Sequence, residues 1–149
     1  MICYSNSNTA LFFSSVDEIP TKIWDELKCT ANIYFHPNFI NALEKNHPDI
    51  IFSYIVLVDQ NNQPIAFASI KIIDFYIDSI KNDLKFLKNI GRKLHVFPDK
   101  KPLKLLICGN TFVSGEHGVF IKNNKDKKVV IKELAERLNH FVNYNKKLK

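Results

Sequence analysis

The sequence predicts a single α/β domain, with a mixed and mainly antiparallel sheet flanked by helices. The apolar runs Phe52–Asp59 and Pro64–Phe75 are separated only by Gln60-Asn61-Asn62-Gln63, a turn sequence typical of a β-hairpin. Apolar residues also recur at helical spacing from about Asp126 to Tyr144. Of the 149 residues 46% are hydrophobic, and neither a linker nor an internal repeat divides them. We therefore expect one domain over residues 1–149.

The segment before the hairpin predicts one strand and two helices. Thr9–Ser14 is short, apolar and aromatic, as expected of a strand. Helices are expected over Pro20–Lys28 and Pro37–Lys45, since proline suits the first position of a helix. A loop, Cys29–His36, joins them. The side chains expected to be buried here are those of Ile23, Trp24, Leu27, Ile33, Tyr34, Phe35, Phe39, Ile40 and Leu43.

Beyond the hairpin, whose strands are apolar on both faces, the sequence predicts a helix, a strand and a last helix. Apolar residues recur at helical spacing from Ile77 to Leu94, opposite a basic face that is either solvated or in contact with phosphate. Leu103–Cys108 is an apolar strand, expected beside the second hairpin strand. The last helix is expected to bury Val130, Ile131, Leu134, Leu138, Phe141 and Val142.

The net charge of +6 has two interpretations: the abundance of Lys, Asn and Ile that an AT-rich coding sequence produces, or a surface that binds an anionic partner. Nineteen of the twenty-one cationic residues are lysines, and arginine, the residue favoured for bidentate phosphate and guanine contacts, occurs only as Arg92 and Arg137. The sequence contains no helix-turn-helix, RNP or zinc-finger pattern. No specific nucleic-acid partner is therefore expected, although a basic surface attracts anionic small molecules.

The chain is expected to be cytoplasmic. Its N-terminus lacks the basic and then apolar pattern of a signal peptide, and no stretch reaches the roughly 20 apolar residues of a membrane helix. Cys3, Cys29 and Cys108 are odd in number and widely spaced, so reduced thiols are expected. No metal site is expected, because no ligand spacing relates His36, His47, His95 and His140.

Glycine is concentrated in one segment. Three of the four glycines lie between Gly109 and Gly118, after the strand Leu103–Cys108 and before the last helix. A strand, a glycine-rich loop and a helix in this order present backbone N–H groups that can hold an anionic group. Within this loop, Glu116 and His117 are the only adjacent carboxylate and imidazole of the chain. The loop is therefore the candidate site.

Four segments carry a resemblance to a known family: Trp24-Asp25, Phe39-Ile40-Asn41-Ala42-Leu43-Glu44, Leu105-Leu106-Ile107-Cys108-Gly109-Asn110 and Ser114-Gly115-Glu116-His117-Gly118. With them, the chain looks like the amino-terminal half of bacterial acetyltransferase-like proteins related to the FemAB peptidoglycan aminoacyltransferases. The order of elements resembles the first part of the GNAT superfamily of N-acetyltransferases. The C-terminal strands of such a fold are missing from the sequence, so a partial GNAT-like domain is expected.

The resemblance implies an acyltransferase site with acetyl-CoA or another acyl-CoA as co-substrate and no covalently bound cofactor. The pantetheine arm would pair with the strand Leu103–Cys108, and a small-molecule or peptidoglycan-precursor amine would accept the acyl group. Glu116 and His117 would be the catalytic acid and base. The residues expected to bind the donor are Cys108, Gly109, Asn110, Ser114, Gly115 and Gly118.

Each of these assignments has an alternative. Glu116 and His117 are equally interpretable as polar residues of an exposed loop, and Asn110 as a loop cap. Cys108 is more readily interpreted as a buried structural thiol than as a nucleophile. The whole chain has a non-catalytic interpretation too, as an assembly module that pairs through its open sheet edge. Either a homodimer or a missing C-terminal half is expected to complete the edge.

Overall fold

The computed structural model describes residues 8–76, 102–109 and 118–144. Its elements are β1 (Thr9–Phe13), α1 (Thr21–Leu27), α2 (Pro37–Asn46), β2 (Ile51–Val58), β3 (Pro64–Phe75), β4 (Leu103–Cys108), β5 (Val119–Ile121) and α4 (Lys127–Tyr144), with 3-10 turns at Val16–Glu18 and Ile33–Phe35. The helix expected over residues 77–94 lies outside the described residues.

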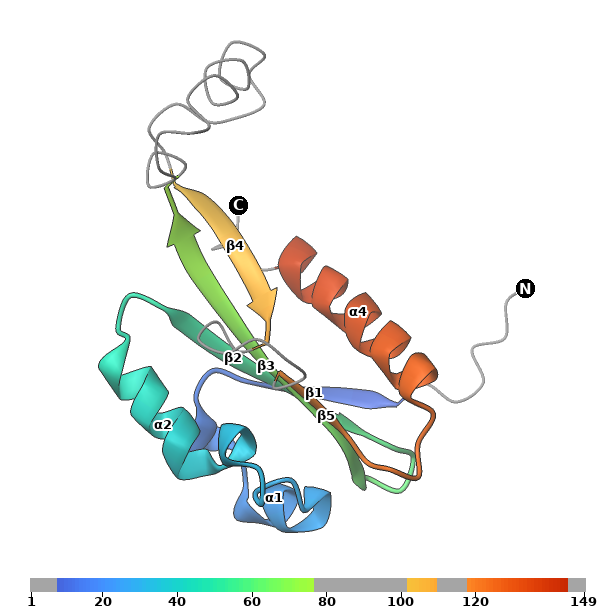
Figure 1. Cartoon of the computed structure of the whole chain (residues 1–149). Coiled ribbons are helices and arrows are strands. Elements are labelled where there is room, and N and C mark those ends of the chain that lie inside the picture. The colour runs from blue at the N-terminus through green and yellow to red at the C-terminus, as the bar shows by residue number, and fades with distance from the viewer. Residues whose placement is uncertain (1–7, 77–101, 110–117, 145–149) are drawn as a thin grey trace, which may run out of the picture.

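All strand pairs of the described sheet are antiparallel, in the order β1-β2-β3-β4. The hairpin prediction is confirmed, because β2 and β3 pair from Ile51 opposite Ile72 to Val58 opposite Pro64. β4 lies beside β3, also as expected. The three-residue strand β5 was not expected, and it pairs with the part of β3 that precedes the β4 contact. In Figure 1 the twisted sheet crosses the molecule and β3 and β4 extend beyond the other strands.

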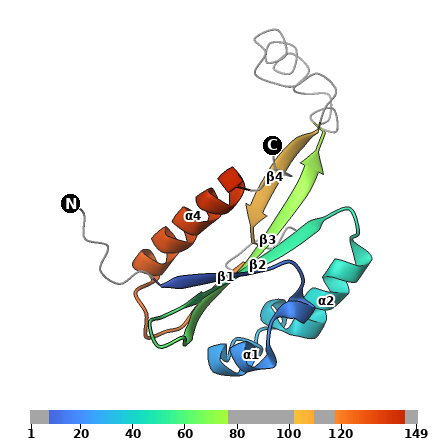
Figure 2. The same ribbon diagram turned by 180° about the vertical axis from the view of Figure 1, so that it is seen from behind.

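The sheet separates two helical layers. α1 and α2 lie on one face and α4 crosses the other, as Figures 1 and 2 show from opposite sides. Trp24 and Phe35 pack on Phe67 of β3 in the first layer, with ring centroids 5.0 and 6.1 Å apart. Val130 and Leu134 of α4 pack on Ile55, Leu57, Ala66, Ala68 and Ile70 in the second. Coverage on both faces explains why seven of the eight residues of β2 are buried.

Two burial expectations are wrong. Ile131 is 55% exposed, since α4 turns its apolar face inward at Val130 and Leu134 and leaves Ile131 on the flank of the helix, beside that face. Ile33 is 59% exposed, because the 3-10 turn that contains it directs only Phe35 into the core. The other expected core residues of α1 and α2 are buried or half-buried.

A carboxylate fixes α2 to the sheet. Glu44 Oε1 accepts hydrogen bonds from the Tyr54 hydroxyl at 2.6 Å and from Val16 N–H at 2.8 Å, and Glu44 Oε2 accepts one from the Ser15 hydroxyl at 2.9 Å. Tyr54 is fully buried, so its hydroxyl needs a partner inside the protein. The bond therefore holds α2 on the face of the sheet that α1 also covers.

Candidate functional site

β4 and β5 are two halves of one edge strand that the chain interrupts. Ile70 of β3 lies opposite Cys108 of β4, and Ala68 lies opposite Val119 of β5. Ser69 stands between them and is shared, since Gly109 N–H donates to Ser69 O at 3.0 Å and Ser69 N–H donates to Gly118 O at 2.9 Å. The chain therefore leaves the sheet at Gly109 and returns nine residues later at the same rung of the ladder.

The backbone requires glycine at both described ends of this excursion, Gly109 and Gly118. Gly109 has φ +148°, a conformation essentially restricted to glycine. A Cβ on Gly118 would come closer than 3.0 Å to the Cα and N of Gly109. These two glycines of the expected loop thus have a structural role, which is to let two chain segments meet at one rung.

The interruption directs backbone groups outward. In an antiparallel ladder, residues alternate between those bonded to the neighbouring strand and those that face away from it. Gly109 and Gly118 bond to Ser69, and Lys122 N–H donates to Ile65 O at 3.0 Å. By this alternation the N–H and C=O groups of Cys108, Val119 and Ile121 point away from β3. No other strand of the described sheet pairs with that side.

A cavity of about 450 Å³ lies at this point of the sheet edge. Its walls come from three places: the turn before α2, the interrupted strand, and the start of α4. The lining residues are Asn32, Phe35, Cys108, Gly109, Gly118, Val119, Phe120, Ile121, Asn123, Lys127 and Ile131. The cavity thus combines apolar walls with outward-facing peptide groups, two amide side chains and one ammonium group.

Cys108 lines this cavity and is exposed, so its interpretation as a buried thiol is wrong. Cys108 lies on the same face of β4 as the half-buried Leu106 but is the last residue of the strand, and its side chain is exposed. Enough protein surrounds the sulfur for desolvation to raise the pKa of the Cys108 thiol. At neutral pH the group is therefore a protonated thiol.

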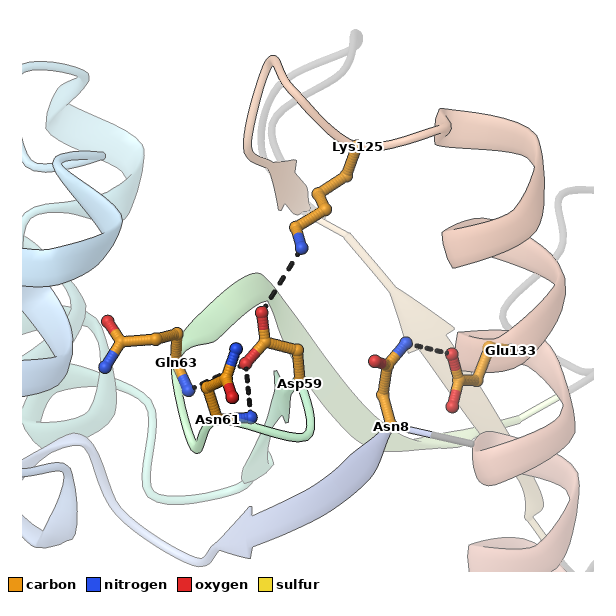
Figure 3. Close-up of polar contacts among 6 residues, drawn as sticks. All are labelled: Asn8, Asp59, Asn61, Gln63, Lys125 and Glu133. Carbon is orange, nitrogen blue, oxygen red and sulfur yellow. Dashed lines mark hydrogen bonds and ion pairs between the residues drawn. The ribbon is translucent and has the colours of Figure 1, made fainter. Parts of the chain in front are cut away.

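At the N-terminus of α4, backbone N–H groups are already hydrogen-bonded to a side chain of the same chain. Asp126 Oδ1 accepts hydrogen bonds from the backbone N–H groups of Lys128 at 2.9 Å and Val129 at 3.3 Å. The preceding residue, Lys125, forms an ion pair with Asp59 at 3.3 Å (Figure 3). Asp59 also accepts from the N–H groups of Asn61 and Gln63, and these bonds lower the pKa of its carboxyl group. Because β5 lies between the glycine loop and α4, the glycines do not form this entrance.

The structure brings three of the expected donor-binding residues together, namely Cys108, Gly109 and Gly118. The other expected site residues, Asn110, Ser114, Gly115, Glu116 and His117, lie outside the described residues. Sequence reasoning missed Asn32, Phe35, Asn123 and Lys127 as cavity residues. The run Val119-Phe120-Ile121 between Gly118 and Asn123-Asn124 is a strand signal that could have revealed β5, and with it the cavity wall.

Comparison with known proteins gives no match: no family model fits the chain, and neither curated proteins nor solved structures align with it. Within residues 8–76, 102–109 and 118–144, no helix has the length and apolar character to cross a membrane. The same residues contain no group of three or more His, Cys, Asp or Glu side chains placed to hold a metal ion.

Proposed function

We propose that the chain is an N-acyltransferase-like module of the GNAT and FemAB type, working in the cytoplasm with an acyl-CoA or an aminoacyl donor. The cavity at the interrupted strand carries this proposal. A pantetheine arm contains two amide groups, and the outward-facing peptide groups of Cys108, Val119 and Ile121 offer donors and acceptors to such an arm along one edge. The antiparallel order β1-β2-β3-β4, with helices on both faces, agrees with the resemblance.

In the proposed reaction an amine is acylated by a thioester. The amine nitrogen attacks the thioester carbonyl carbon, a C–N bond forms, and negative charge develops on the carbonyl oxygen. A base removes one proton from the amine; Glu116 and His117 are our candidates. The C–S bond then breaks, and the leaving thiolate takes up the proton. A backbone N–H near Gly109 or the Asn110 amide is our candidate donor to the oxyanion.

Acetyl-CoA binding to the purified chain tests the proposal. We expect calorimetry to detect weak binding, and a substitution in the cavity wall, Ile131→Glu, to weaken it at least tenfold, since a carboxylate there is placed against apolar surface. Val129→Glu is the matched control: Val129 is 59% exposed on the same helix and does not line the cavity. An absence of heat at millimolar acetyl-CoA, with an unchanged melting temperature, would sink the proposal.

The transfer step has its own readout. With a lysine-containing peptide as acceptor, we expect chromatography to detect free CoA release above the rate without protein. Glu116→Gln or His117→Ala is expected to lower that rate by roughly 10²–10⁴ while leaving acetyl-CoA binding intact. Loss of binding in both variants, with the fold retained, would assign these residues to donor binding instead.

The second candidate function is a non-catalytic assembly module. It is favoured by the alternation along β4, which turns the peptide groups of Lys104, Leu106 and Cys108 outward, where a strand from a second copy of this chain would extend the sheet. The segment Val119–Lys122 is the alternative way to cover this edge, but it does not fold back beside β4, because β5 pairs with β3. Light scattering showing a dimer, with protection of the Leu106 and Cys108 amides from hydrogen exchange, would support this function over the enzyme.

A further inference from the structure

Another hollow lies at the opposite edge of the described sheet, where β1 pairs with β2 on one side and with no described strand on the other. Its volume is about 370 Å³, within the range of small-ligand sites. Its walls are the outer edge of β1 and one side of α4, and the lining residues are Asn8, Thr9, Ala10, Phe12, Arg137 and His140. It shares no lining residue with the cavity at β4 and β5, so the proposed acyl transfer leaves it unused.

Two contacts hold α4 along β1 and leave space between them. Arg137 Nη2 donates a hydrogen bond to Asn8 O at 3.0 Å. Four residues later on each element, the rings of Phe141 and Phe12 stack with their centroids 5.5 Å apart. Asn8, Ala10 and Phe12 are spaced two apart and therefore lie on one face of the strand. The small side chain of Ala10 does not fill the space between the two contacts, which explains the hollow.

The Arg137 guanidinium is held in place beside this space. Its Nη2 lies 3.7 Å from Glu133 Oε1. Glu133 Oε2 in turn accepts a hydrogen bond from the Asn8 amide at 2.6 Å (Figure 3). Glu133 does not line the hollow, whereas Arg137 does. Because these contacts use Nη2, the N–H groups on Nε and Nη1 have no acceptor among the described residues. A planar fork of N–H donors in a fixed position suits a carboxylate.

The position of Arg137 indicates which carboxylate fits. Arg137 contacts Asn8, which directly precedes β1, so a strand added antiparallel to β1 would bring its C-terminus to the guanidinium. The unpaired peptide groups on the outer side of β1 would bond to such a strand. Phe12 is 45% exposed at the far end of the hollow and offers apolar surface to one of its side chains.

We propose that the hollow between β1 and α4 binds the C-terminal end of an extended peptide, with the carboxylate on Arg137 and the last peptide groups on the outer edge of β1. This site goes beyond the proposed acyl transfer and does not depend on it. A small carboxylic acid carries the same charged group but no peptide groups, and the experiment separates the two.

NMR titration of the isotope-labelled chain with acetyl-Val-Thr-Val, a peptide of strand-forming residues with a free C-terminus, tests the proposal. We expect saturable shifts of the Ala10 and Phe12 amide signals. The same peptide with a C-terminal amide should bind at least about tenfold more weakly, because it lacks the charge that pairs with the guanidinium. Acetate, the carboxylate alone, should also bind at least about tenfold more weakly, because it offers no peptide groups to β1.

Two variants change the hollow in different ways. Arg137→Lys keeps a positive charge beside Glu133 but loses the planar fork, and Ala10→Leu fills the space between strand and helix. Each should retain the dispersed amide spectrum of the folded chain and bind acetyl-Val-Thr-Val about tenfold more weakly or worse. Lys132→Gln is the matched control, since it removes an exposed positive charge from α4 outside the hollow. It should bind the peptide as the unmodified chain does.

Equal affinity for the acid and the amide would overturn recognition of the carboxylate. Acetate binding as tightly as the peptide would overturn the added strand. Full affinity in both hollow variants, or shifts confined to β4 and β5, would place the peptide elsewhere and overturn the proposal. The absence of any shift at millimolar peptide would overturn it too, and none of these outcomes bears on acetyl-CoA binding.

Discussion

Gly118 and Gly109 share one rung of the sheet, each supplying half of the hydrogen-bonded pair that a single residue would normally make with Ser69. Their backbones approach so closely that a Cβ on Gly118 would overlap the Cα of Gly109. The contact closes the excursion of the chain between them and fixes the position of the cavity walls at Cys108 and Val119. Two glycines thus connect the continuity of the sheet to the shape of the candidate site.

Gly118→Ala is expected to destabilise the fold, because the added Cβ meets backbone atoms that cannot rotate away. We expect a loss of about 1–3 kcal/mol in the free energy of unfolding, the usual range for overpacking. Asn124→Ala, in the exposed turn after β5, is the control and should stay within about 0.5 kcal/mol of the unmodified chain. Urea unfolding measures both. Equal midpoints for Gly118→Ala and the unmodified chain would contradict the close approach.

Removal of residues 110–118 is expected to leave the sheet intact. The deletion joins Gly109 directly to Val119, which then continues the strand opposite Ala68, where it already pairs. Removing a loop of this length also removes a closure cost of about 1–2 kcal/mol. Thermal unfolding of the shortened chain should therefore show a melting temperature no lower than that of the unmodified chain.

The control deletion removes only residues 110–117. Gly118 then takes the place opposite Ala68, so the side chains of β5 move to the wrong faces of the sheet or the strand must bulge. A clear fall in melting temperature is expected for this variant. If the two deletions behaved alike, β4 and β5 would not be parts of one strand.

The sequence predicted the elements whose signals are local. The hairpin followed from two apolar runs around Asn61-Asn62, and α1 and α2 followed from helical apolar spacing after a proline. Their predicted bounds differ from those of the structure by no more than one residue. β5 was missed because three residues are too few to show a period. Ile131 was wrongly expected to be buried. It is apolar and adjacent to Val130 in the sequence, but in the helix it lies outside the buried face that Val130 helps to form.

The site was predicted only in part, for a physical reason. The cluster of glycines indicated where the chain leaves the sheet. It could not show that Gly109 and Gly118 both bond to Ser69, because that depends on how β4 and β5 are aligned with β3. Asn32 and Phe35 lie far from the glycines in sequence and reach the cavity only through packing of the first helical layer. The Asp126 cap, by contrast, is local, and the sequence placed the start of the last helix at that residue.

Tyr54→Phe is expected to lower the free energy of unfolding by about 1–2 kcal/mol, because it removes a buried hydrogen bond to a carboxylate. Glu44→Ala should cost more, about 2–4 kcal/mol, since it leaves the Tyr54 hydroxyl and Val16 N–H without their acceptor. Combining the two changes should cost less than their sum. Strict additivity in a double-mutant cycle, measured by urea unfolding, would show that the pair does not couple α2 to β2.

The stability of the fold is expected to fall at alkaline pH through Cys29. Burial raises the pKa of this thiol from 9.0 to about 11. The folded state therefore retains a proton that the unfolded state loses above pH 9, so this contribution is complete below pH 9 and lost between pH 9 and 11. The slope is about 1.4 kcal/mol per pH unit. Cys29→Ala should have a shallower decline than the unmodified chain over that window; parallel curves would contradict the raised pKa.

Alkylation of Cys108 reports occupation of the cavity, since the thiol is exposed and lines it. At pH 8 we expect iodoacetamide to modify Cys108 slowly, because its pKa is raised, and to leave the buried Cys29 unmodified in the folded chain. Saturating S-acetyl-pantetheine should slow modification of Cys108 at least fivefold, measured by peptide mass spectrometry. Ile131→Glu should abolish this protection, whereas Val129→Glu should retain it. Protection that persists in Ile131→Glu would place the ligand elsewhere on the molecule.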